Sequence, residues 1–169
     1  LTVSDVDTAD SVTASVSGLV VTGTSDRSDA AAPSDAELLA MLTVTPPAIL
    51  DNTETTDTLT WDFNSGTETF DYLAAGETLI LTYTVQADDT AASDTETVTI
   101  TITGTNDAPV ITGGPDTAGL SETDAALTAT GTLTVSDVDT TDAVTASVSG
   151  LVVTGTSDRS DAAAPSDAE

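Results

Sequence analysis

The chain has 169 residues, with two Arg, no Lys or His, and 29 Asp or Glu, so its formal net charge at pH 7 is −27. This balance argues against nucleic acid, whose binding needs Lys and Arg at the phosphates, and it disfavours an anionic membrane surface. The absence of cysteine excludes disulfides as a source of stability. Divalent cations are natural partners for such a charge, which repels itself in a compact state; solubility in a salty medium is the alternative explanation.

The beginning of the chain recurs almost unchanged at its end. Residues 1–37 and 133–169 align at a constant offset of 132 residues and differ at only two positions. Identity at Ser, Thr and Ala positions indicates a recent duplication within a long array, and a period of this length suits one ordinary domain. We therefore expect one period of a tandem array followed by a part of the next.

Strict alternation of apolar and polar residues predicts half-buried β-strands along the first period. Thr occupies many of the polar positions, where its branched side chain suits a pleated sheet. In chain order the apolar stripes are Val12-Ala14-Val16, Leu59-Trp61, Leu79-Leu81-Tyr83-Val85 and Val98-Ile100-Ile102, with a new start at Leu133-Val135. This order argues against disorder, which the charge alone would permit.

Two segments between the stripes carry local structural signals. Residues 34–42 are the only stretch with a helical pattern, and Ser34 and Glu37 have the spacing of a capping box. We expect this short helix to pack across an end or edge of the sheets. Further along, Asn64-Ser65-Gly66 predicts the turn of a β-hairpin between residues 61–63 and 67–70.

Short strands with regular turns predict an all-β fold, an antiparallel β-sandwich with one short helix near 34–42. Aromatic side chains should supply much of its core: Trp61, Phe63, Phe70, Tyr72 and Tyr83. Trp61 is most simply a core residue, and a platform for stacking a sugar ring is the alternative.

Three parts of the sequence resemble VCBS repeats, which are similar to cadherin-like and bacterial immunoglobulin-like domains. Residues 98–110 resemble the closing strand and linker of these repeats, residues 133–139 the opening strand and acidic turn, and residues 73–85 the penultimate strand. The resemblance implies a module of a large RTX-type adhesin, exported by a type I system to the bacterial cell surface. It also implies calcium-stiffened linkers between neighbouring repeats.

The family pattern places a repeat boundary near Ala108-Pro109. Residues 1–107 would then hold one repeat without its opening segment. Residues 108–169 would hold the opening segment and the first half of the next repeat. The neighbouring repeats of the same array are accordingly the expected partners.

Acidic turns follow both copies of the first strand. Asp5, Asp7 and the nearby Asp10 form the first turn, and Asp137 and Asp139 recur in the second. An extended chain places Asp5 and Asp7 on one side, and carboxylates are ligands that calcium (Ca²⁺) prefers. Asp is also common in ordinary turns, so the motif alone leaves both explanations open.

The linker adds to this calcium hypothesis by resemblance. Asn106-Asp107-Ala108-Pro109 resembles the linkers of cadherin repeats, where calcium lies between consecutive domains and an aspartate pair follows about thirty residues later. Asp137 stands 31 residues after Asn106. The resemblance thus implies a junction site made of Asn106, Asp107, Asp137 and Asp139.

Three further acidic residues are candidate calcium ligands, on less support than the junction residues. Asp88 and Asp89 lie between two predicted core strands and would either join the junction site from the preceding repeat or form a simple acidic loop. Glu122 resembles the glutamate near the end of a cadherin opening segment, and it would serve the next junction along the array.

No combination of residues predicts catalysis. Without His, Cys or Lys there is no ordinary base to activate a Ser or Thr nucleophile, and nothing distinguishes one carboxylate pair for glycoside hydrolysis. We expect a structural spacer in an adhesin array, acting in cell adhesion or biofilm formation, and not an enzyme. The alternatives are a module that itself binds a glycan or cell surface, and a subunit that donates residues 108–132 head to tail to the next chain.

Overall fold

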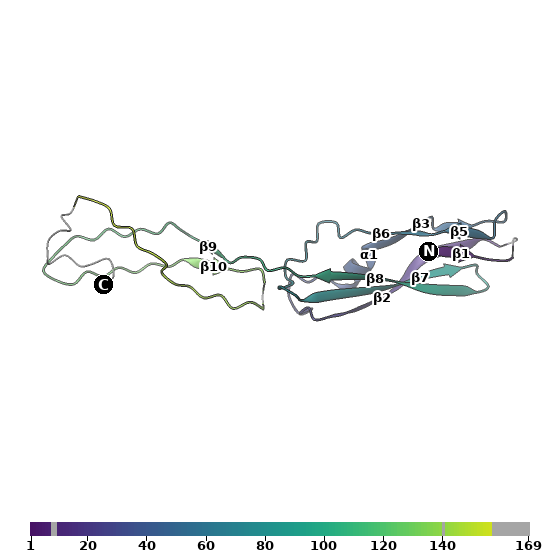
Figure 1. The fold of residues 1–169 in the computed structure, drawn as a ribbon, viewed down its shortest axis with the longest axis horizontal. Helices are drawn as coiled ribbons and strands as arrows, with labels where there is room; N and C mark the ends of the chain where they lie inside the picture. Colours follow the sequence, from purple (N-terminus) through teal and green to yellow (C-terminus); the bar gives the residue numbers. More distant parts are fainter. Residues whose placement is uncertain (8–9, 140, 157–169) are drawn as a thin grey trace.

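The computed structural model describes residues 1–7, 10–139 and 141–156 (Figure 1). Its elements, in chain order, are β1 (Thr2–Ser4), β2 (Val12–Gly23), α1 (Asp35–Ala40), β3 (Leu42–Thr45), β4 (Ala48–Leu50), β5 (Thr56–Thr58), β6 (Thr60–Phe63), β7 (Thr78–Asp88), β8 (Ser93–Thr103), β9 (Val110–Thr112) and β10 (Thr134–Ser136). Every strand pairing is antiparallel. The predicted all-β class is confirmed.

A four-stranded sheet in the order β4-β2-β7-β8 is the largest unit. Its centre is β7, whose alternate residues Leu79, Leu81, Tyr83 and Val85 are buried, as the apolar stripe predicts. Strand β8 pairs with β7 in unbroken register from Thr78↔Thr103 to Asp88↔Ser93. The hairpin β7–β8 therefore forms a long scaffold whose two ends lie roughly 30 Å apart, since a strand rises about 3.4 Å per residue.

Two smaller strand pairs, β1–β5 and β3–β6, accompany the large sheet. In Figure 1, β3 and β6 lie above β2 and β7. Phe63 of β6 meets Tyr83 of β7 edge to face, with ring centroids 6.4 Å apart, and this contact joins the two units. Whether the units form a complete two-sheet sandwich stays a prediction.

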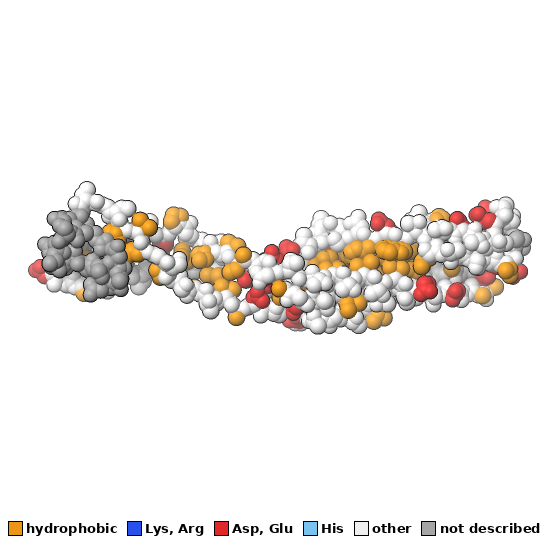
Figure 2. Space-filling view, in the orientation of Figure 1, with side chains coloured by type: hydrophobic (Ala, Val, Ile, Leu, Met, Phe, Trp, Pro, Cys, Tyr) orange, Lys and Arg blue, Asp and Glu red, His pale blue; other side chains and the backbone are white. Residues whose placement is uncertain are grey.

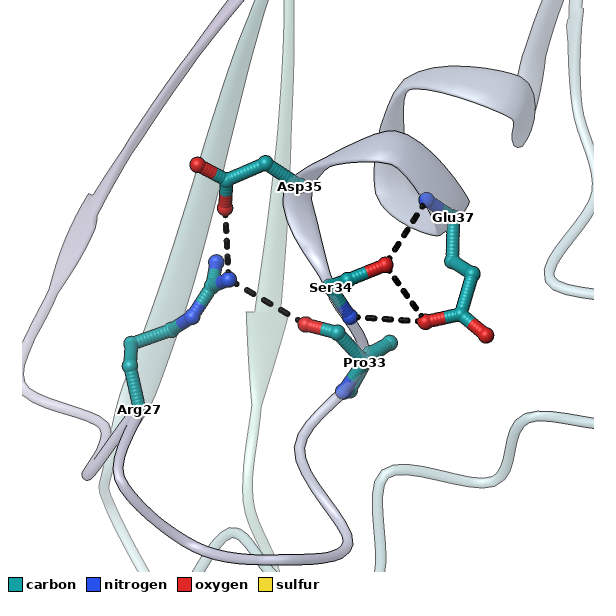
Figure 3. A network of polar contacts seen from close by, with 5 residues as sticks. All are labelled: Arg27, Pro33, Ser34, Asp35 and Glu37. Carbon is teal, nitrogen blue, oxygen red and sulfur yellow. Dashed lines mark hydrogen bonds and ion pairs between the residues drawn. The ribbon is translucent and has the colours of Figure 1, made fainter.

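Helix α1 begins at the predicted capping box. Ser34 accepts a hydrogen bond from the Glu37 amide, and the Glu37 carboxylate accepts one from the Ser34 amide. Arg27 bonds Asp35 in the first turn and the carbonyl of Pro33 (Figure 3). At the other end, the buried Tyr83 hydroxyl donates to the Leu38 carbonyl at 2.8 Å. The helix is thus anchored to the centre of the sheet.

The predicted hairpin around residues 64–66 is wrong. Strand β6 pairs with β3 instead, and residues 64–77 form a loop. Turn hydrogen bonds do form there, from the Gly66 amide to Asn64 and from the Glu68 amide to Ser65. The chain after the turn enters the core and does not pair, because Phe70 and the residues at 72–73 are buried.

The prediction that Trp61 is a core residue is also wrong. It is 41 % exposed on β6, whereas Leu59, two residues earlier, is 2 % exposed. The alternation fails because Leu59 lies between strands β5 and β6, where its amide donates to the Leu1 carbonyl. The aromatic core consists of Phe70, Tyr72 and Tyr83, with Phe63 packed partly buried against it.

The described residues after 107 contain only the short antiparallel pair β9–β10, and a single segment connects them to the β1–β8 part (Figure 1). Their apolar side chains are largely exposed, including Val110, Ile111, Leu133 and Val135. The repeat boundary near Ala108 remains a prediction. In the described part of the chain, no helix has the length and apolar character needed to cross a membrane.

Candidate metal centres

The connection between the two parts is held by Asp139. The Asp107 amide donates to Asp139 Oδ2 at 2.7 Å, across 32 positions in sequence. The Asp139 amide in turn donates to Asp137 Oδ1 at 3.1 Å, and the Asp142 amide donates to the Asp139 carbonyl at 2.9 Å. Three of the four residues of the predicted junction therefore meet: Asp107, Asp137 and Asp139.

Asp139 is the one buried charged residue among the described residues, with 1 % of its surface exposed. Its second carboxylate oxygen, Oδ1, is buried and has no hydrogen-bond partner in that part of the chain. A buried, unpaired carboxylate oxygen is costly unless a cation or donor satisfies it. Because its other oxygen accepts one hydrogen bond, from the Asp107 amide, the Asp139 carboxylate would suit a hard cation such as calcium.

Asp5, Asp10 and Asp89 form a second acidic group. Carboxylate oxygens of all three lie within 4.8 Å of one another, and each side chain is half-buried. The turn after β1 positions the first two: the Asp5 amide donates to the Thr55 carbonyl at 3.0 Å, and the Asp10 amide to the Asp7 carbonyl at 3.1 Å. Three like charges this close repel one another, and a hard divalent cation would offset that repulsion.

Asp89 reaches this group from the turn between β7 and β8. Its Oδ1 accepts hydrogen bonds from the amides of Ala92 at 2.6 Å and Ala91 at 2.8 Å. These two bonds lower the pKa of Asp89 below its ordinary value. The carboxylate is therefore charged at neutral pH and available to a cation.

The two copies of the acidic turn differ in burial and in contact with the linker. Asp7 and Asp139 are equivalent in the 132-residue repeat, yet Asp7 is exposed and Asp139 is buried. In the second copy the Asp107 amide binds the carboxylate. Within the described residues no such contact reaches Asp7, whose own amide donates to Asp5 Oδ1 at 2.9 Å. Contact with the linker thus accompanies burial of the aspartate.

The remaining predicted ligands are not brought together. Asp88 accepts from the Thr90 amide and from Gln86 within its own turn, and it lies with Asp89 at the end of β7–β8 opposite to Asn106. The structure therefore does not place Asp88 or Asp89 at the Asp107–Asp139 junction. Asn106 is exposed beside it, and Glu122 is exposed between β9 and β10.

Asp10 was not among the predicted ligands, although it lies in the predicted acidic turn. Its grouping with Asp89 depends on the pairing of β2 with β7, which brings the two ends together: Thr13 pairs with Asp88. The sequence carries no direct signal for that register. Figure 2 shows acidic side chains gathered at the narrow joint between the two parts and again toward the far end of the β1–β8 part.

Comparison of the chain with family models, curated proteins and solved structures finds no match.

Proposed function

We propose that this chain belongs to a tandem array of spacer modules in a secreted bacterial surface adhesin, in which calcium at the module junctions stiffens the array. The observation that carries this proposal is Asp139, which is buried against the linker amide of Asp107 and has one carboxylate oxygen without a hydrogen-bond partner among the described residues. The near-identical repeat at 1–37 and 133–169 supports a spacer role, because spacing depends on the number of modules more than on their individuality.

At the junction, Asp139 and Asp137 would hold the ion, with oxygens of Asn106 and Asp107 as further ligands from the linker. Asp5, Asp10 and Asp89 would hold another ion at the opposite end of the module. Bound calcium supplies positive charge in a chain of net charge −27 and fixes the direction in which the linker leaves the module. As part of the same proposal, the protein is secreted to the cell surface and does not act as an enzyme.

Calcium titration calorimetry on the full chain tests the assignment. Extracellular modules bind calcium with dissociation constants of about 10⁻⁴–10⁻³ M. Asp139→Asn removes one negative charge from the junction and should abolish one binding event while leaving the other. Asp62→Asn, on an exposed face of β6, makes the same charge change away from both sites and should bind as the wild type does.

A complementary variant separates the two sites. Asp5→Asn with Asp10→Asn should remove the event that Asp139→Asn leaves. Loss of calcium binding to the same small extent in all variants, Asp62→Asn included, would mean that the ion only screens the net charge. That outcome would end the proposal of specific junction sites.

A second candidate, a module that binds a glycan, has one observation in its favour. Trp61 is 41 % exposed on β6, and exposed aromatic rings are natural surfaces for stacking a sugar. Binding of the wild type to a glycan array with calcium present, lost in Trp61→Ala, would favour recognition over spacing. If neither protein binds any glycan on the array, only the spacer role remains supported.

A further inference from the structure

Residues 144–155 repeat the sequence of β2 (Val12–Gly23) without a difference. The two positions at which the repeated segments differ, 9/141 and 11/143, both precede the strand. The first copy pairs with β7 from Thr13↔Asp88 to Gly23↔Leu79. The second copy forms no strand, and its side chains are exposed, Val148 by 93 % and Val152 by 87 %. Within residues 1–156, two copies of one strand sequence therefore match a single β7.

Either copy offers β7 the same side chains. The buried or partly buried residues of β2 that pack in the core are Val12, Ala14, Val16, Leu19 and Val21. The residues at the 132-residue offset are identical to these five. Because a slip of one residue moves the buried face of a strand to solvent, residues 144–155 can bury this face only in the register of β2. In that register Val152 lies opposite Thr82, where Val20 lies in the structure.

The segments that precede the two copies match as well. Strand β10 (Thr134–Ser136) repeats the residues of β1, so it can pair with β5 as β1 does. Asp137 and Asp142 repeat Asp5 and Asp10, the two acidic residues that meet Asp89. A chain in which residues 133–155 replace residues 1–23 therefore keeps its strand pairing, its buried face and its acidic group.

The connection to the second copy is long enough for this replacement. Residues 104–143 follow β8, and a chain of that length spans roughly 130 Å when fully extended. Strand β2 begins at the β7–β8 turn, roughly 30 Å from the other end of that hairpin. The first copy is favoured by its shorter connection to α1, although the entropy of closing a loop rises only slowly with its length. It is also favoured because the second copy gives up the bond between Asp139 and the Asp107 amide when it moves.

We propose that residues 144–155 are an alternative second strand, which pairs with β7 in place of β2, so that neighbouring repeats exchange this strand. Because β2 lies between β4 and β7, the exchange needs an open sheet. It therefore takes place during folding, or after β2 has been pulled away from β7, and exchange of this kind is a characteristic event in repeat proteins. It depends only on residues 1–156, whatever precedes or follows them. Two exchanged repeats are joined by a shared sheet as well as by the linker.

Disulfide trapping tests the exchange, since the protein has no cysteine of its own. Chains are refolded from urea at low concentration under mild oxidation, in chelator so that the result does not depend on the calcium proposal. Thr82→Cys with Val20→Cys reports the local pairing, and Thr82→Cys with Val152→Cys reports the exchanged pairing. The control is Thr82→Cys with Val153→Cys, one position further and on the opposite face. We expect the Val152→Cys pair to form the intramolecular disulfide at least tenfold more than this control.

Disabling the first copy gives an independent measurement. Ala14 is 5 % exposed, so Ala14→Asp places an unpaired charge in the core and prevents β2 from pairing there. The chain should still unfold cooperatively in urea, because residues 144–155 replace β2, and the yield of the Val152→Cys disulfide should rise at least threefold. Ala14→Asp combined with Ala146→Asp disables both copies and should not fold. Equal loss of folding in the single and double variants, or a Val152→Cys yield no higher than that of the Val153→Cys control, would overturn the proposal.

Discussion

Tyr83 and Tyr72 are both buried, but among the described residues only the hydroxyl group of Tyr83 forms a hydrogen bond. Tyr83 donates to the Leu38 carbonyl at 2.8 Å, whereas the Tyr72 hydroxyl has no partner among the described residues. The Leu38 carbonyl also accepts from the Met41 amide, so it keeps one hydrogen bond when Tyr83 is changed. The two tyrosines therefore form a matched pair for measuring one buried hydrogen bond.

Tyr83→Phe should lower the free energy of unfolding by about 1 kcal/mol, the usual net value of such a bond. For a domain of about 100 residues this is a fall in Tm of roughly 4–8 °C. Tyr72→Phe removes an unsatisfied hydroxyl and should be neutral or slightly stabilising. Urea denaturation of both variants checks this. A Tyr72→Phe loss as large as that of Tyr83→Phe would contradict the assigned roles.

The same hydroxyl predicts how stability depends on alkaline pH. Burial raises the pKa of Tyr83 from 10.0 to about 12. Between these values the unfolded chain releases the Tyr83 proton while the folded chain keeps it, so stability falls as pH rises through this window. The advantage of the wild type over Tyr83→Phe should be complete below pH 10 and shrink toward pH 12. A difference that stays constant from pH 9 to 12 would show that burial does not hold the proton.

At the scale of single residues, some features could be predicted from the sequence and others could not. The Ser34–Glu37 capping box could be predicted because its partners are three positions apart and need no tertiary structure. Trp61 and the Asp10–Asp89 contact could not, because each depends on how distant segments meet. Asp139 is intermediate: its role as a ligand was predicted by resemblance, but its burial and its bond to Asp107 are visible only in the structure.

At the scale of elements, the β7–β8 hairpin fixes the positions of both acidic sites. Its turn carries Asp89, and the chain leaves its other end at Gly104, two residues before the linker. Gly104 lies against the loop that precedes β7: its amide donates to the Glu77 carbonyl, and its carbonyl accepts from the Gly76 amide. A Cβ at this position would lie 2.3 Å from the carbonyl oxygens of both Leu73 and Ala74.

Gly104→Ala should therefore destabilise the protein by about 1–3 kcal/mol, because backbone atoms must move to accept the methyl group. Gly119→Ala is the control, since nothing lies within 4 Å of the added carbon, and its effect should be within about 0.5 kcal/mol. Thermal unfolding of both variants provides the measurement. Equal stability of the two would mean that the loop does not press against Gly104.

The strands themselves were the most predictable elements. The stripes at 79–85 and 98–102 became β7 and β8, because period-two alternation arises from burial of one sheet face, whatever the topology. The predicted hairpin at 64–66 failed, although its turn residues do form a turn. A turn specifies the local direction of the chain, but pairing depends on competing partners, and β3 is the partner of β6.

At the scale of the whole molecule, acidic residues are most costly where they crowd, and they crowd at the junction and at the β7–β8 turn. A cation bound there would relieve repulsion within the compact state and, under the proposed function, would order the linker. At free calcium about 100 times the dissociation constant, one site adds about 2.7 kcal/mol to the stability of the folded state. Sodium chloride of matched ionic strength screens the charge but cannot satisfy Asp139 Oδ1, so the two effects can be separated.

The most direct test of the calcium-ordered junction is amide hydrogen exchange at Asp107 by NMR, in calcium and in chelator at matched ionic strength. The amide donates to Asp139, so an ion on that carboxylate should hold the linker in place. We predict that calcium slows exchange of the Asp107 amide at least tenfold in the wild type and in Asp62→Asn, and not in Asp139→Asn. Equal exchange with and without calcium in the wild type, or slowing that persists in Asp139→Asn, would contradict the account.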